Sequence, residues 1–183
     1  MFRFFGCDCM PNYRRTLIPG GSYFFTVNLL DRKDDLLVRE VAHLRQSFSR
    51  AKRRHPFRMD AIVILPDHLH AVITLPDGDS DFPKRWRLIK TYFSRLIPNS
   101  EARSDVRRRR NERGIWQRRY WEHFLRDERD FIRHVEYCYF NPVKHKLVEY
   151  PRDWKHSTFH RDVRCGRMTP DWSGREVDGE FGE

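Results

Sequence analysis

Four short stretches of this chain are rich in β-branched and aromatic residues and are bounded by Pro, Gly or Asp, a pattern typical of β-strands. They cover residues 22–30, 57–65, 68–75 and 115–125. In the third stretch every second residue from Leu69 to Leu75 is apolar, so these side chains share one face and are predicted to face the core. His68 and His70 then lie on the opposite face. Pro66 and Asp67 predict a tight turn that makes the second and third strands antiparallel neighbours.

Three longer stretches repeat apolar residues every three or four positions, which predicts amphipathic helices over residues 36–54, 82–97 and 128–141. Asp81 and Asp127 are suitable N-caps for the second and third helices, and Pro56 ends the first. The third helix has an apolar arc and, beside it, a polar stripe that contains Asp130, His134, Tyr137 and Asn141. A helix packed by that arc would hold Tyr137 at the sheet.

The predicted order is strand, helix, strand, strand, helix, strand, helix. This is the split βαβ, ferredoxin-like (RRM-like) pattern of an α+β protein with an antiparallel sheet and an added C-terminal helix that carries the tyrosine. Two helices cover the Leu69 face, so the third is expected on the face of His68 and His70. At 183 residues the chain is long enough for one domain, expected over residues 12–150. Residues 1–11 are expected to be a disordered extension and residues 151–183 an irregular tail.

Composition favours a nucleic-acid partner. The chain has 36 Lys and Arg residues, a net charge of +10 and 14% aromatic residues, which suits phosphates and unpaired bases. A soluble basic protein whose aromatic residues all lie in the core remains the alternative. Residues 98–114 contain four successive arginines without apolar periodicity, which predicts a mobile basic loop. No apolar run approaches the ~20 residues of a membrane span, so we expect no membrane partner and a cytoplasmic location.

Two short motifs carry the candidate chemistry. His68 and His70 are two residues apart on a predicted strand, and Tyr137 and Asn141 are four apart on a predicted helix, so each pair shares a face. Two imidazoles and an amide oxygen offer a divalent ion three ligands, and this mixed set admits Mg²⁺ or Mn²⁺. A tyrosine has a pKa near ~10 and needs activation to act as a nucleophile. His134, one turn earlier, is available. The constellation predicts a metal-assisted enzyme that nicks a phosphodiester with Tyr137.

Each motif also has a simpler interpretation. The two histidines can be ordinary strand residues, and Tyr137 can be a packing residue. Asn141 precedes Pro142, which disfavours helix at that position. Tyr139 is a competing nucleophile, although it lies on the apolar arc. A non-catalytic module that binds single-stranded nucleic acid, and a metal hydrolase that activates water, are the rival functions.

The sequences PDHLHAVITLP at residues 66–76 and HVEYCYFNPVKHKLV at residues 134–148, together with WQRRYWEH, resemble the REP-associated tyrosine transposases. These are single-tyrosine HUH enzymes related to insertion-sequence transposases, and the resemblance spans about residues 12–172. It implies that His68 and His70 are the HUH pair, Tyr137 the nucleophile and Asn141 the third metal ligand. Lys146 stands where such proteins usually have Gly.

The resemblance also implies a substrate and a reaction. The substrate would be single-stranded REP DNA, an imperfect palindrome that folds into a hairpin, and cleavage would pass through a 5′-phosphotyrosine. Related insertion-sequence enzymes assemble their active sites across a dimer, whereas the REP-associated group looks able to work as a monomer, so the resemblance implies a monomer rather than a dimer. Action on chromosomal repeats implies a place at the nucleoid.

Basic residues from several parts of the chain are candidates for contacts with DNA. Solvated surface charge is the alternative for each of them. The candidates are Arg14, Arg15, Arg85, Arg87, Lys90, Arg107, Arg108, Arg109, Arg110 and Arg118.

Overall fold

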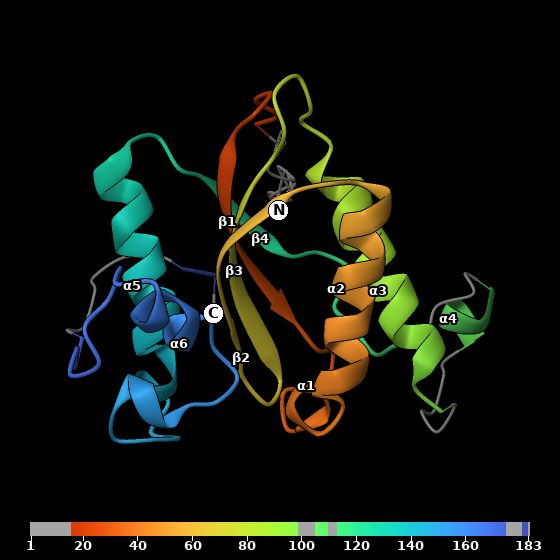
Figure 1. The fold of residues 1–183 in the computed structure, drawn as a ribbon. Coiled ribbons are helices and arrows are strands. Elements are labelled where there is room, and N and C mark those ends of the chain that lie inside the picture. Colours follow the sequence, from red (N-terminus) through yellow and green to blue (C-terminus); the bar gives the residue numbers. More distant parts are fainter. Residues whose placement is uncertain (1–15, 99–104, 110–112, 175–180, 183) are drawn as a thin grey trace, which may run out of the picture.

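A computed structural model describes residues 16–98, 105–109, 113–174 and 181–182. Its centre is a sheet of four strands in the order β2-β3-β1-β4, with antiparallel neighbours throughout (Figure 1). The strands are β1 (Ser22–Asn28), β2 (Arg58–Ile64), β3 (His68–Thr74) and β4 (Trp121–Phe124). This order confirms the predicted ferredoxin-like sheet, because the first and second strands are separated by the third.

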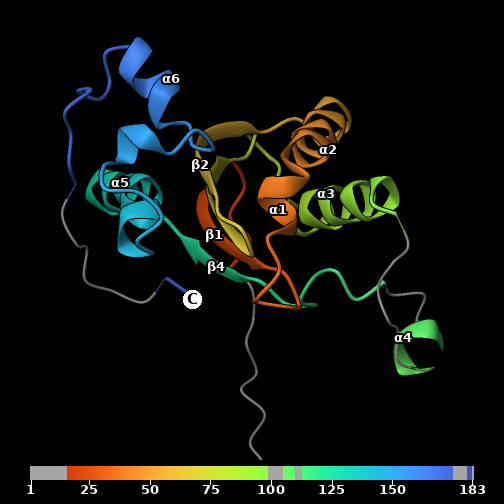
Figure 2. The ribbon, with the colours of Figure 1, turned by 90° about the horizontal axis from the view of Figure 1, so that it is seen from below.

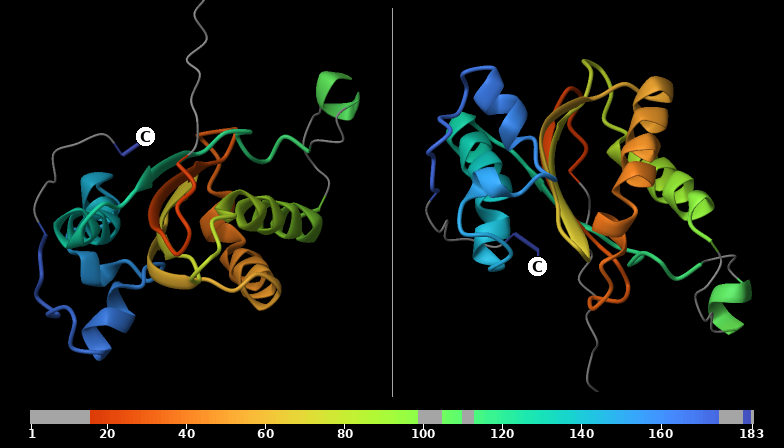
Figure 3. Two further views of the ribbon diagram at one scale, coloured as in Figure 1. Left: turned by 90° about the horizontal axis from the view of Figure 1, so that it is seen from above. Right: turned by 60° about the horizontal axis from the view of Figure 1, so that its bottom comes forward.

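Helices cover both faces of the sheet. α1 (Leu36–Arg39), α2 (Val41–Arg54) and α3 (Phe82–Leu96) lie on one side, and α5 (Glu128–Lys144) lies on the other (Figures 1 and 2). The short α4 (Asp105–Arg109) stands apart from both layers (Figure 3). The third predicted helix is therefore on the expected face, opposite the other two.

Two apolar cores follow from this arrangement. The larger one lies under α2 and α3 and contains Leu69, Ala71 and Ile73 of β3, as their alternation predicts. The smaller one lies under α5 and contains Phe24 of β1 and Tyr137. Because both faces of β1 are covered, almost all of its side chains are buried. The face of the sheet that carries His68 and His70 is called the histidine face below.

Several element boundaries differ from the predicted ones. The helix predicted over residues 36–54 is interrupted at Glu40 and forms α1 and α2. β4 has only four residues, and the segment before it forms an isolated bridge between Trp116 and Leu29, the residue after β1. The predicted basic loop contains α4, a single exposed turn that apolar periodicity could not reveal.

α5 continues three residues beyond its predicted end and includes Pro142. Proline removes one helical hydrogen bond, but Asn141 and Pro142 are both buried, and packing maintains the helix around them. The chain then turns at Lys146, whose φ of 57° is in the left-handed region that favours glycine.

Residues 151–174, expected as an irregular tail, contain the 3₁₀ turn η1 (Pro151–Asp153) and α6 (Phe159–Arg164). The segment pairs with the edge strand β2, where the Ile64 amide donates to the His156 carbonyl at 2.9 Å. This contact covers part of an exposed sheet edge. The domain division at residue 150 stays a prediction, and residues 1–11 lie outside the described part. No helix among the described residues is long and apolar enough to cross a membrane.

Candidate active site

β3 places both histidines of the predicted metal pair on the histidine face. His68 and His70 are 1% and 0% exposed, and their rings lie nearly perpendicular with centroids 5.0 Å apart. The interpretation as half-exposed strand residues is therefore wrong. A buried pair of imidazoles on one face is a suitable start for a metal site.

Neighbouring side chains fix which nitrogen of each imidazole carries the lone pair. The Nδ1 of His68 lies 2.7 Å from a carboxylate oxygen of Asp67, which can only accept, so Nδ1 carries the proton. The Nδ1 of His70 lies 2.8 Å from the hydroxyl of Thr26. That hydroxyl donates its own proton to the Phe181 carbonyl, so it accepts from His70. Both rings thus carry the lone pair on Nε2, the arrangement found behind metal-bound histidines.

Asp67 is held in its ionised form. Burial by itself would raise the pKa of Asp67, but the hydrogen bond with His68 and the charge of Arg32 outweigh it, and the pKa is lowered. Arg32 lies 2.6 Å from the second oxygen of this carboxylate. The turn between β2 and β3 therefore supplies a negative charge behind His68.

Tyr137 projects from α5 toward the histidine face. It is 2% exposed, and its ring meets that of His70 at a centroid distance of 5.2 Å. Its hydroxyl oxygen accepts a hydrogen bond from the Nζ of Lys144 at 3.0 Å. The structure thus brings the predicted nucleophile to the predicted metal pair within one chain.

Asn141 lies one turn beyond Tyr137 and is fully buried. The end of the same helix also reaches the metal pair, because the ring of His145 lies 5.1 Å from that of His68. This placement is compatible with the predicted ligand role of Asn141, which stays a prediction.

Sequence reasoning missed two residues that touch Tyr137. Lys144 follows Tyr137 by seven positions, which is two turns on the same helix face, so its spacing could have revealed it. Phe181 could not be found this way. Its ring stacks on Tyr137 with centroids 3.6 Å apart and planes at 10°.

His134 does not occupy the place expected of a base for Tyr137. Its Nδ1 lies 2.8 Å from the Asp130 carbonyl, and its ring packs on Phe24 and Phe181. Burial lowers the pKa of His134. Among the described contacts, the Nζ of Lys144 lies on the Tyr137 hydroxyl.

Tyr139, the competing nucleophile, points into the smaller core. Its hydroxyl donates to the carboxylate of Asp162 at 2.5 Å. Burial and this carboxylate both raise the pKa of Tyr139 well above its ordinary value. A phenol that is harder to ionise, and far from the histidine pair along its helix face, is poorly suited to attack a phosphate.

The predicted DNA contacts fall into several environments. Arg14, Arg15 and Arg110 lie outside the described residues. Arg85 is 2% exposed, and its guanidinium bonds to Asp79 at 2.7 Å and to the Pro56 carbonyl at 2.6 Å. The prediction for Arg85 is wrong, because it clamps two loops inside the fold. Those with exposed side chains are Arg87, Arg108, Arg109 and Arg118.

Three candidates line one groove of about 1070 Å³ between α3, α4 and residues 113–118. They are Lys90, Arg107 and Arg118, and Arg95 and Arg113 add two further cations. The groove also contains the indole of Trp116, which lies 5.8 Å from the Lys90 ammonium. A basic groove with an aromatic wall can hold a nucleic-acid backbone and a base.

No protein-family model matches this chain. It is 44% identical over 174 residues to the REP-associated tyrosine transposase of Escherichia coli (strain K12), covering 95% of this chain and 98% of that protein. It is 42% identical over 166 residues to a putative REP-associated tyrosine transposase of Haemophilus influenzae, covering 90% and 94%. A solved structure of a REP-associated tyrosine transposase bound to a REP hairpin superposes with a TM-score of 0.83 at 44% identity, over 95% of this chain and 98% of that one.

Proposed function

The chain belongs to the REP-associated tyrosine transposases, and we propose that it cleaves and rejoins single-stranded DNA at REP hairpins, with Tyr137 as the nucleophile. The observation that carries this proposal is the contact between Tyr137 and His70 within one chain. Because one chain supplies both groups, a monomer suffices for the reaction. Action on chromosomal REP DNA would place the protein at the nucleoid.

The metal in this proposal is Mg²⁺ or Mn²⁺, held by His68, His70 and Asn141. The residues fit such an ion, because Asp67 and Thr26 leave the lone pairs of both imidazoles on Nε2. Nitrogen and amide-oxygen ligands together accept Mg²⁺ or Mn²⁺. When bound, the ion would neutralise charge on the phosphate that is cleaved.

Tyr137 performs the covalent step. Its hydroxyl loses its proton as the oxygen attacks the phosphorus and the oxygen–phosphorus bond forms. The bond to the 3′ oxygen of the preceding nucleotide breaks, and this oxygen takes up a proton. The products are a 5′-phosphotyrosine and a free 3′-OH, and the reverse reaction rejoins the strand without ATP. Lys144 would keep a positive charge beside the attacking oxygen.

The basic groove is the proposed seat of the hairpin. This is supported by its charge and by the hairpin bound to the relative of similar structure. The groove lies beside α3, whereas Tyr137 lies on the histidine face. A single strand leaving the hairpin would therefore pass the β4 edge, where Arg118 and Arg119 are exposed.

The test uses end-labelled single-stranded DNA that contains a REP hairpin, incubated with the protein and Mn²⁺ or Mg²⁺ and run on a denaturing gel. The unaltered chain should form a protein–DNA adduct that resists denaturation. Tyr137→Phe should lose both cleavage and adduct while its DNA affinity stays nearly unchanged. Tyr139→Phe, two residues away, is the matched control and should keep the adduct. His68→Ala and His70→Ala should each lose metal binding together with cleavage.

Three results would contradict the proposal in different ways. Cleavage without an adduct would indicate a hydrolase that activates water. Binding of the hairpin without any cleavage would indicate a binding module. An adduct that persists in Tyr137→Phe and disappears in Tyr139→Phe would show that Tyr139, and not Tyr137, is the nucleophile.

A further inference from the structure

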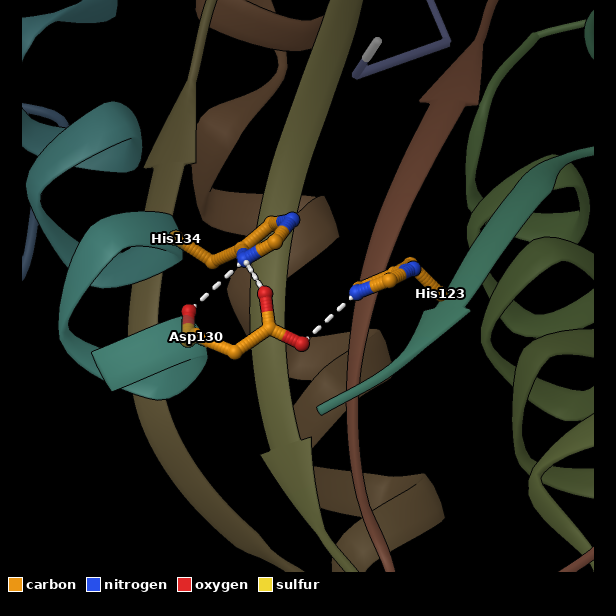
Figure 4. A group of neighbouring side chains, drawn as sticks. All are labelled: His123, Asp130 and His134. Carbon is orange, nitrogen blue, oxygen red and sulfur yellow. Dashed lines mark hydrogen bonds and ion pairs between the residues drawn. The ribbon is translucent and has the colours of Figure 1, made fainter. Parts of the chain in front are cut away.

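A second group of metal-ligating side chains lies on the histidine face, between β4 and the first turns of α5. His123 comes from β4, and Asp130 and His134 come from α5 (Figure 4). One ligand atom of each residue lies within 4.8 Å of the others. The carboxylate of Asp130 stands between the two rings, 2.8 Å from the Nε2 of His123 and 3.1 Å from the Nδ1 of His134.

This group is separate from the His68–His70 pair. The ring of Phe24 lies between them, because it stacks on His70 at 5.4 Å and packs on His134 at 4.8 Å. The strand register agrees with this position of Phe24, because His123 of β4 lies directly opposite Phe24 of β1. An apolar ring between two polar groups excludes one shared ion.

We propose that His123, Asp130 and His134 form a second metal site, which takes a transition-metal dication such as Zn²⁺. Two imidazoles and one carboxylate are a usual protein ligand set for Zn²⁺, with water in the fourth position. Mg²⁺ prefers oxygen ligands and is a poor match for two imidazoles. Ligands in a tetrahedral zinc site lie about 3.4 Å apart, so the side chains need only small movements.

Binding would replace the present hydrogen bonds. Each ligating ring would carry its proton on the other nitrogen, which is Nδ1 for His123 and Nε2 for His134. The Nδ1 of His134 would also give up its contact with the Asp130 carbonyl at 2.8 Å. The amide of Arg126, which donates to the Asp130 carboxylate at 3.2 Å, can keep its place on the second lone pair.

The consequence of ligation is mechanical. β4 pairs with β1 at the edge of the sheet, and α5 makes its main contacts with β2 and β3. An ion held by both β4 and α5 would tie the first turns of the tyrosine helix to the opposite edge. This cross-link between β4 and α5 does not depend on the proposed DNA chemistry.

The experiment isolates this site by removing the other. The full chain with His68→Ala and His70→Ala is stripped with a chelator and titrated with Zn²⁺ by calorimetry, and with Co²⁺ by visible absorption. We expect one equivalent of Zn²⁺ to bind, a Co²⁺ spectrum of a four-coordinate site, and a rise in Tm on adding Zn²⁺. Adding Asp130→Asn should weaken Zn²⁺ binding at least 10-fold and abolish the rise in Tm.

A second substitution, His123→Gln, keeps the result interpretable if Asp130→Asn does not fold, and circular dichroism checks the fold of each variant. The matched control is His43→Ala, because His43 forms a comparable pair with Glu40 on the exposed side of α2, 2.9 Å apart. It should leave Zn²⁺ binding unchanged. The proposal is overturned if the double alanine variant binds no Zn²⁺, or if binding survives both Asp130→Asn and His123→Gln.

Discussion

Tyr137 and Tyr139 lie two residues apart on one helix, yet their hydroxyls have opposite electrostatic partners. The Tyr137 oxygen accepts from the ammonium of Lys144, whereas the Tyr139 hydroxyl donates to the carboxylate of Asp162. A cation favours loss of the phenolic proton, and an anion opposes it. The local environment therefore favours Tyr137 over Tyr139 as the proposed nucleophile.

This difference predicts the effect of removing the cation. Lys144→Met keeps the aliphatic stem over the Tyr137 ring but removes the charge that lies 3.0 Å from its oxygen. We expect the rate of adduct formation to fall on the order of 10²-fold, because the phenol loses its proton less readily without the cation. Affinity for the hairpin should change little. Single-turnover gel assays measure both, with Lys146→Met as the control. An unchanged rate would mean that Lys144 only packs on the ring.

Spacing in the sequence predicted part of the site but not all of it. A separation of two residues on a strand and of four on a helix fixes which side chains share a face, so His68, His70 and Tyr137 could be identified. The contacts of Phe181 depend on where the chain returns more than forty residues later, and no local pattern encodes such a return. The same holds for His123 and His134, which come from two different elements.

At the scale of elements, the chain just after α5 adopts a backbone conformation that is unfavourable for the residue there. Lys146 is in the left-handed region with φ of 57°, which costs a residue with a side chain about 1 kcal/mol relative to glycine. Lys146→Gly should therefore raise the free energy of unfolding by about 1 kcal/mol and Tm by about 2 to 4 °C. Thermal denaturation measures the change. Lys155→Gly is the control, and a rise of equal size there would exclude the conformational explanation.

The clamp between Asp79 and Arg85 predicts a pH dependence. The hydrogen bond from Arg85 holds the pKa of Asp79 below its ordinary value. A lowered pKa in the folded state stabilises the fold above about pH 4, and this contribution is lost as the pH falls through the folded pKa. Asp79→Asn should lower the free energy of unfolding by about 1 to 2 kcal/mol at neutral pH, because it removes the ion pair with Arg85. The loss is no larger because Asp79 is partly exposed. The difference in free energy of unfolding between Asp79→Asn and the unaltered chain should shrink below about pH 4.

Urea denaturation of both proteins across a pH series measures this difference. Asp77→Asn, in the same loop and exposed, is the control. A constant difference between Asp79→Asn and the unaltered chain down to pH 3 would contradict the role given to this carboxylate.

The periodic parts of the fold were predictable, and the exceptions have local causes. Alternating and helical patterns identified four strands and the main helices, because burial of one face produces those patterns. The single turn of α4 buries nothing and leaves no apolar signal. Pro142 indicated an earlier end for α5, but burial of Asn141 and of Pro142 itself outweighs the missing hydrogen bond.

At the scale of the whole molecule, the basic groove and the candidate nucleophile Tyr137 lie on different faces of the sheet. Residues of α3 and α4 line the basic groove, and Tyr137 is part of α5. α3 and α5 lie on opposite sides of the sheet (Figure 3). Replacing Arg107, Arg108, Arg109 and Arg110 by Ser should lower the slope of log K against log salt by roughly 0.7 to 0.9 for each arginine that contacts phosphate. Cognate and scrambled hairpins should lose affinity alike.

Fluorescence anisotropy across a salt series checks this prediction. Lys52, Arg53 and Arg54 are exposed on α2 and outside the groove, so replacing them by Ser is the control. An unchanged slope in the loop variant would place the DNA elsewhere, and a loss confined to the cognate hairpin would mean that the loop reads sequence or shape.

Phe181 stacks on Tyr137, so Phe181 and an incoming nucleotide would compete for the same space beside the Tyr137 ring. A nucleotide base that stacks on the same face of Tyr137 would have to displace a ring that belongs to the same chain. A tethered competitor has an effective concentration set by its linker, not by the amount of protein in solution. The apparent dissociation constant for the reactive nucleotide is then the intrinsic one divided by the fraction of molecules with Phe181 displaced. Dilution, which releases a separate inhibitor, leaves this ratio unchanged.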